Sequence, residues 1–258
     1  IDLNKNISDN FIINLYKEMD KVLVNENIDP DLEVSQIHRE SKETEFKFYD
    51  CTRHFDVFNT FDIIPENCFG CFKILIQPRN IIEMLKLYLV FDNLKSKMNL
   101  TRKCMIELRS NIKGAYKGYI YCVGLQEAKK TLSIIDPILD KTISSEMPRL
   151  IRRGCSEFSI SYPEFKQIDQ NSKNFMKYDF NWKKKEQIID NKLSVKKKEN
   201  INQGETLSGL SLKDLLVIKN WLLYAKIIGD ETYKNFTNLP KNSAFIEKKL
   251  NAQFIENL

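Results

Sequence analysis

Residues 72–77 read FKILIQ, and Pro78 follows them directly. A short apolar run of this kind, bounded by proline, predicts a buried strand. The next residues, 79–94, are apolar around most of a helical wheel, which predicts a well-buried helix. This strand and helix begin an alternation of elements that continues along the chain.

Three more strands and one more helix are predicted after residue 94. The strands are expected at 102–109, 118–123 and 151–161, and the helix at 125–143. The order β-α-β-β-α-β is the ferredoxin-like arrangement, in which two helices cover one face of an antiparallel four-stranded sheet. The predicted fold class is therefore α+β. Strand alternation predicts the side chains that face the helices: Ile74, Ile106, Ile120 and Phe158.

The rest of the chain is assigned by composition. The predicted segments are an acidic N-terminal part with a helix at 8–25, the core at 66–165, a Lys-rich linker and a C-terminal helical part. The acidic part covers 1–65, the linker 166–206 and the C-terminal part 207–258, with helices expected at 211–228 and 243–257. Residues 32–50 give no clear pattern.

Composition places the chain among globular proteins. Of its 258 residues, 42% are hydrophobic and 29% are charged, and the mean hydropathy is −0.40. These values exclude a collagen-like or wholly disordered chain. No apolar run reaches the roughly 18 residues of a membrane helix, and the given sequence does not open on a basic and apolar leader, so a cytoplasmic protein without a membrane partner is expected.

Charge is distributed unevenly. Residues 1–65 carry a net charge of −7, residues 66–165 carry +6, and residues 166–200 carry +5. Six of the eight arginines fall between Arg79 and Arg153, and arginine suits bidentate contact with oxyanions. Either the acidic and basic segments neutralise each other, or the basic middle faces an anionic ligand.

Four residues have the spacing of a zinc site. Cys51 and His54 are separated by two residues, and so are Cys68 and Cys71. Two such pairs are a common way to present four ligands to tetrahedral zinc, and a complete set would make the site structural. The N-terminal part is therefore predicted to be stabilised by Zn²⁺. One alternative is a strand in which Cys51 and His54 are ordinary packed residues, and another is an iron–sulfur cluster.

Cys155 is the only candidate for a catalytic residue. Arg152 and Arg153 precede it, and neighbouring cations favour a nucleophilic thiolate. The alternative is that Cys104, Cys122 and Cys155 are small buried apolar residues of the sheet.

The predicted third strand carries a basic residue, a glycine and alternating aromatic residues. This stretch, residues 117–123 (KGYIYCV), resembles part of the signature of the RNA-recognition-motif family over seven residues. Alternation places Tyr119 and Tyr121 on one face, where bases could stack. The stretch departs from the family at Ile120, where a small residue is usual, and the first strand lacks the partner motif, so no family is assigned.

Three functional classes agree with these patterns. The first is a zinc-stabilised protein that binds or processes nucleic acid, most simply RNA, on a basic and aromatic sheet face. The second is an enzyme acting on a small phosphate or carboxylate held by arginines, with Cys155 as nucleophile, and the third is a protein-interaction subunit. The predicted anion-binding residues are Arg102, Arg109, Lys117, Tyr119, Tyr121, Arg152 and Arg153. No phosphate loop, dinucleotide-binding or hydrolase signature is present.

Overall fold

A single antiparallel sheet forms the centre of the protein. The computed structural model describes residues 2–25, 36–39, 50–94, 101–107, 112–193, 212–236 and 248. Within these ranges five strands pair in the order β1-β3-β4-β2-β5. They are β1 (Gln36–Arg39), β2 (Cys71–Ile76), β3 (Arg102–Ile106), β4 (Tyr116–Val123) and β5 (Arg149–Arg153).

Helices make up most of the other described elements. They are α1 (Asp9–Asn25), α2 (Cys51–Phe61), α3 (Glu66–Phe69), α4 (Ile81–Leu94), α5 (Leu125–Thr142), α6 (Ser156–Ser161), α7 (Lys183–Leu193) and α8 (Leu212–Ile227). Short 3₁₀ turns are η1 (Pro163–Lys166), η2 (Phe180–Trp182) and η3 (Glu231–Asn235). The predicted α+β class is confirmed. From β2 to β5 the elements run strand, helix, strand, strand, helix, strand.

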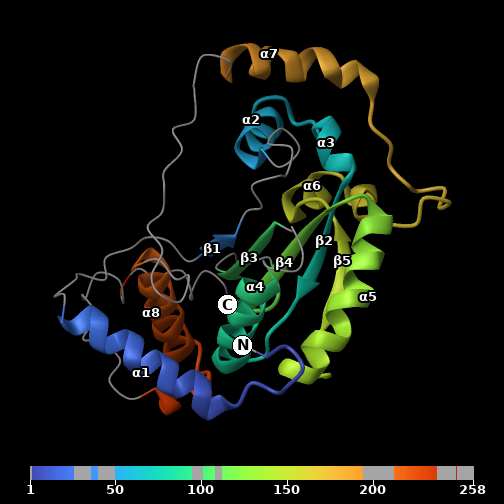
Figure 1. The fold of residues 1–258 in the computed structure, drawn as a ribbon. Coiled ribbons are helices and arrows are strands. Elements are labelled where there is room, and N and C mark those ends of the chain that lie inside the picture. Colours follow the sequence, from blue (N-terminus) through green and yellow to red (C-terminus); the bar gives the residue numbers. More distant parts are fainter. Residues whose placement is uncertain are drawn as a thin grey trace.

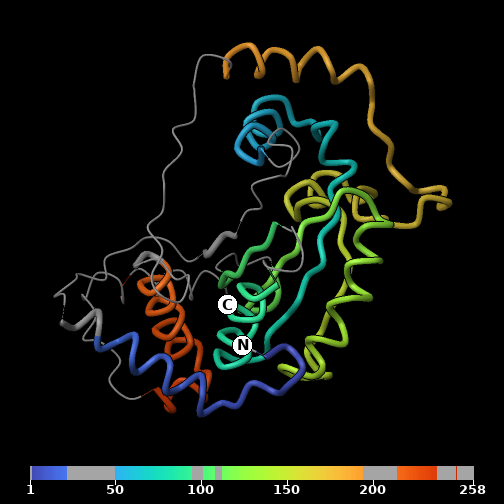
Figure 2. The backbone as a smooth tube through the Cα atoms, viewed as in Figure 1, coloured from blue at the N-terminus to red at the C-terminus, as the bar shows by residue number. Residues whose placement is uncertain are grey.

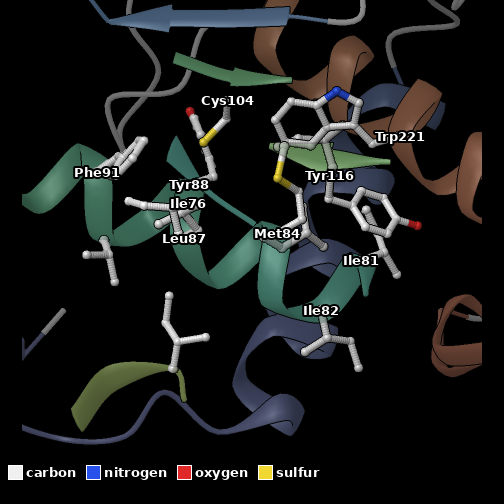
Figure 3. Close-up of a cluster of buried hydrophobic side chains, with 14 of the residues drawn as sticks. Ile76, Ile81, Ile82, Met84, Leu87, Tyr88, Phe91, Cys104, Tyr116 and Trp221 are labelled. Atoms are coloured by element: carbon white, nitrogen blue, oxygen red, sulfur yellow. The ribbon is translucent and has the colours of Figure 1, made fainter. Parts of the chain in front are cut away.

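The main core lies between one face of the sheet and helices α4 and α5, with α1 and α8 packed against α4 (Figure 1). Ile74, Ile106 and Ile120 lie in this core, as strand alternation predicts. Figure 3 shows the part of the core around α4, where Trp221 of α8 joins side chains from α4 and the strands. A Cβ on Gly118 of β4 would lie 2.5 Å from Leu87 Cδ2, so this glycine permits the close approach of α4.

A smaller aromatic cluster joins α2, α3, α6 and η1. Its buried members are Ile64, Cys68, Phe158 and Phe165. Helix α7 lies beside α2 at the outer edge of the molecule (Figure 2). Arg53 of α2 donates to Glu186 at 2.5 Å and to Asp190 at 2.7 Å, and both carboxylates belong to α7. These ion pairs hold α7 against α2.

The fourth predicted strand is shorter than expected. The sequence predicted extended chain over 151–161, whereas β5 ends at Arg153 and residues 156–161 form helix α6. Gly154 has a φ of +56°, a left-handed conformation that ends the strand and that glycine adopts without strain. Phe158 therefore lies on α6 in the aromatic cluster, and its predicted place on the helix-facing side of the sheet was wrong.

Several described elements fall where the sequence predicted none, among them α2, α3, β1 and α7. Strand β1 lies in the unassigned residues 32–50 and pairs with β3. Helix α7 lies within the predicted linker, and it forms because Glu186 and Ile189 bury one face of it against the body. Of the helix predicted at 243–257, only Lys248 belongs to the described residues.

Candidate functional site

A cleft with a volume of about 940 Å³ lies on the face of the sheet opposite α4 and α5. Its floor is formed by strand residues that alternate with core residues: Lys73, Lys103, Met105, Tyr119, Tyr121, Leu150 and Arg152. Helix α2 contributes Cys51 and Phe55 to the wall, and the turn into α6 contributes Cys155. The cleft thus joins the sheet to the elements of the aromatic cluster.

Successive side chains of a strand point to opposite faces, and in residues 72–77 (FKILIQ) this places one lysine in the cleft. Phe72 and Ile74 of β2 lie in the main core, so the residue between them must face the other side of the sheet. That residue is Lys73, which lines the cleft and is only 9% exposed. A strand that is apolar on its core face therefore places a nearly buried cation on its other face.

The strand register brings cations and a tyrosine into one row. Lys73 is the partner of Arg152 on β5 and of Tyr121 on β4. Neighbouring strands lie about 4.8 Å apart, and like charges directly opposite each other are unfavourable. In the described part of the chain, neither Lys73 nor Arg152 forms an ion pair with a carboxylate. An anion bound between the two cations would relieve their repulsion.

The Lys73 ammonium is held by a thiol and two aromatic rings. Its Nζ donates to Cys155 Sγ at 3.1 Å and lies 5.2 Å from the Tyr121 ring centroid and 5.7 Å from that of Tyr119. Burial alone would lower the pKa of Lys73, but the Cys155, Tyr121 and Cys71 side chains raise it well above its usual value. Lys73 is therefore charged at neutral pH.

Most of the charged side chains that line the cleft are basic. Lys103 and Lys166 line it together with Lys73 and Arg152. Of the two carboxylates among the described lining residues, Glu107 is already paired with buried Lys117 at 3.3 Å, and both side chains are 1% exposed. The other carboxylate, Glu157, accepts a hydrogen bond from the Ser156 hydroxyl. The surplus of positive charge suits an anionic ligand.

The structure brings four of the predicted anion-binding residues to the cleft. Tyr119, Tyr121, Arg152 and Arg153 line it. Lys117 is fully buried in its ion pair with Glu107, so it offers no exposed charge. Arg102 pairs in register with core residue Ile120 and is 2% exposed, which places it on the helix-facing side. Arg109 lies outside the described residues.

The Arg153 side chain is held by aromatic rings and backbone carbonyls. Its guanidinium lies over the rings of Phe69, Phe165 and Phe175, with a closest centroid distance of 4.1 Å to Phe175. It also donates to the backbone carbonyls of Phe69 and Met176. Burial lowers the pKa of Arg153 to about 10, so it remains a cation at neutral pH. Its contacts join the end of β5 to the aromatic cluster.

The four predicted zinc ligands are divided among three elements, and of the four Cys51 lines the cleft. Cys51 begins α2 and His54 lies one turn later, whereas Cys68 is in α3 and Cys71 begins β2. Within the described residues, no three His, Cys, Asp or Glu side chains are arranged to hold a metal ion. His54 Nε2 is buried without a hydrogen-bond partner among the described residues, and burial and Arg53 lower the pKa of His54 to about 4. Zinc binding stays a prediction.

Sequence reasoning missed three cations of the cleft, namely Lys166 of η1 and two strand residues, Lys73 and Lys103. Both occur in strands that were predicted, and Ile74 was correctly assigned to the core face. Alternation alone therefore could have placed Lys73 on the opposite face beside Tyr121. Lys103 could have been found in the same way from Ile106.

The chain matches none of the protein-family models, curated proteins or solved structures with which it was compared. Among the described helices, none combines the length and the apolar character that crossing a membrane requires.

Proposed function

We propose that this protein binds single-stranded nucleic acid in the basic and aromatic cleft. The observation that carries the proposal is the row formed by Arg152, Lys73 and Tyr121, in which two cations that pair with no carboxylate among the described residues adjoin an aromatic ring. Proteins that bind single strands combine a positively charged groove for the backbone with aromatic rings for the bases. The row offers both.

The size of the cleft suits short pieces of an extended strand. Its volume of about 940 Å³ is at the upper end of small-molecule sites. Tyr119 and Tyr121 are half-buried, with ring centroids 6.3 Å apart, and both rings lie beside the Lys73 ammonium. A phosphate that reaches Lys73 therefore lies close to a ring on which a base can stack, a contact worth about 1–3 kcal/mol.

We propose RNA as the first nucleic acid to test, because residues 117–123 resemble an RNA-recognition-motif strand. The sheet supports the finer fold proposal as well. Residues 71–153 run strand, helix, strand, strand, helix, strand, with antiparallel pairing throughout. This order supports a ferredoxin-like unit whose open face carries the ligand.

The test is the affinity of a fluorescent single-stranded RNA at two salt concentrations, with DNA of the same sequence in parallel. Arg152→Gln is expected to weaken binding about tenfold and to lower the slope of log affinity against log salt by about 0.7. Lys184→Gln on α7 removes the same charge from an exposed position outside the cleft lining, and it serves as the matched control.

Two results would reject nucleic-acid binding in the cleft. One is the absence of binding to either polymer at low salt. The other is an equal loss in Arg152→Gln and Lys184→Gln, because it would show general attraction to the charge of the protein and no site.

A second candidate is an enzyme for a small phosphate or carboxylate, favoured by the 3.1 Å contact between Lys73 Nζ and Cys155 Sγ at the edge of the cleft. In this account Lys73 and Arg152 hold the substrate and Cys155 is the nucleophile. A mononucleotide or inorganic phosphate that displaces labelled RNA at concentrations similar to unlabelled RNA would favour this candidate, because the polymer would then add no contacts.

A further inference from the structure

The cleft wall carries a thiol whose surroundings differ from those of the other described cysteines. Cys155 is half-buried, lines the cleft and accepts a hydrogen bond from the Lys73 ammonium. Reactive cysteines in proteins lie in partly exposed, electropositive surroundings, which Cys155 has. Besides this hydrogen bond, Lys73 pairs with no carboxylate in the described chain although it is more than nine-tenths buried, so its charge can also meet an anion that enters the cleft.

We propose that Cys155 is a modification site that exchanges with small anionic disulfides and forms a mixed disulfide inside the cleft.

The reaction is an ordinary thiol–disulfide exchange. The Cys155 thiolate attacks one sulfur of the incoming disulfide, a new S–S bond forms, and the original S–S bond breaks. The leaving thiolate carries away the electron pair of the broken bond and takes a proton from water. The small disulfide is the oxidant, so the step needs no other reactant.

The other described thiols are less suited to this reaction. Cys68, Cys104 and Cys122 are buried, with exposures of 5%, 2% and 0%, so an incoming disulfide has little access to them. Cys71 does not belong to the cleft lining. Cys51 lines the same cleft, is exposed and is the closest competitor, but within the described residues no ammonium donates a hydrogen bond to its sulfur. Selectivity for Cys155 follows from the ammonium beside it.

The charge of the cleft determines which disulfides react. Lys73 and Arg152 are adjacent across the sheet, and Lys103 and Lys166 also line the cleft. Carboxylates on the incoming disulfide are therefore attracted and cationic groups are repelled. A mixed disulfide at Cys155 places its carboxylate beside Lys73, in the place proposed for phosphate. Inhibition of nucleic-acid binding by the adduct rests on the proposed function, whereas the exchange itself does not.

The experiment compares two aliphatic disulfides of similar size, the dianion dithiodipropionate and the dication cystamine. Each is added to the full chain near neutral pH, adducts are followed by intact mass, and the modified cysteine is identified by peptide mapping. Each rate is divided by the rate for the chain unfolded in denaturant, which removes the difference in intrinsic reactivity. The variants are Cys155→Ser, Lys73→Met and Arg152→Gln, with Lys184→Gln as the control.

Cys155 is expected to be modified first, with a normalised rate at least about tenfold higher for the dianion than for the dication. Arg152→Gln should reduce this preference and Lys184→Gln should leave it unchanged. Lys73→Met should slow the reaction, and circular dichroism tests whether this variant is folded. Arg152→Gln keeps the test decisive if Lys73→Met does not fold, because Arg152 is exposed.

Three results would overturn the proposal. They are first modification at Cys51, equal normalised rates for the two disulfides, and a preference for the dianion that Arg152→Gln leaves intact. None of these depends on nucleic acid. Loss of RNA binding after modification is a separate readout, so failure of the proposed function can be distinguished from failure of the exchange.

Discussion

Replacing Gly154 by alanine should destabilise the protein through two separable effects. The φ of +56° is left-handed, and an L side chain there costs about 1–2 kcal/mol. The added Cβ would also lie 2.3 Å from Phe165 Cε1 and 2.7 Å from Phe165 Cζ. Phe165 is fully buried with its ring against those of Phe69 and Phe158, so it has little room to move. Overpacking of this kind costs about 1–3 kcal/mol.

The expected loss for Gly154→Ala is therefore about 2–5 kcal/mol, measured as the free energy of unfolding in urea. Gly229→Ala is the matched control, since Gly229 has a φ of +76° but no atom within 4 Å of an added Cβ. The control should lose only the conformational part, about 1 kcal/mol. Losses for the two variants that agree within about 0.5 kcal/mol would refute the packing of Phe165 over Gly154, and with it this account of how the chain turns from β5 into α6.

Three further predictions concern stability and metal content. Arg53→Met leaves the buried Glu186 carboxylate without its cation and should lower the free energy of unfolding by about 3 kcal/mol; a loss under about 1 kcal/mol would contradict the role of this ion pair. Asp230→Ala removes the acceptor of the Tyr116 hydroxyl, 2.7 Å away, and should cost about 2–3 kcal/mol in the same assay. Tyr116→Phe removes the hydroxyl itself and should cost only about 1 kcal/mol. If it costs as much as Asp230→Ala, the larger loss is not caused by a buried hydroxyl left without an acceptor. The sequence-based zinc prediction expects one Zn²⁺ per chain in metal analysis of protein purified without chelator, and its loss in Cys68→Ser; content near zero in the unmodified chain overturns it.

The elements of the core could be predicted because their patterns are local. The strand at 72–77 and the helix after it bury most of their side chains, and apolar periodicity reports burial directly. The end of β5 could not be found in this way, because residues 151–161 are equally compatible with extended chain and with a strand followed by a short helix. Gly154 decides between them through a tertiary contact, the Phe165 ring that occupies the space of a Cβ.

Much of the candidate site depends on contacts between distant segments. Tyr119 and Tyr121 could be placed on one face from alternation alone, and they line the cleft. The Lys73–Cys155 contact spans 82 residues and depends on the pairing of β2 with β5, which no local pattern encodes. Arg153 shows the opposite error, since a cation next to Arg152 in sequence lies among aromatic rings and outside the basic row.

Ultraviolet cross-linking of bound RNA, followed by mass spectrometry of the linked peptides, tests directly whether RNA binds in the cleft. Zero-length cross-links form only where a base touches a side chain, so they locate the ligand without any substitution. We predict cross-links on the β4 peptide that contains Tyr119 and Tyr121, and we expect fewer of them after modification of Cys155. Cross-links confined to the Lys-rich helix α7, with none on β4, would contradict binding in the cleft.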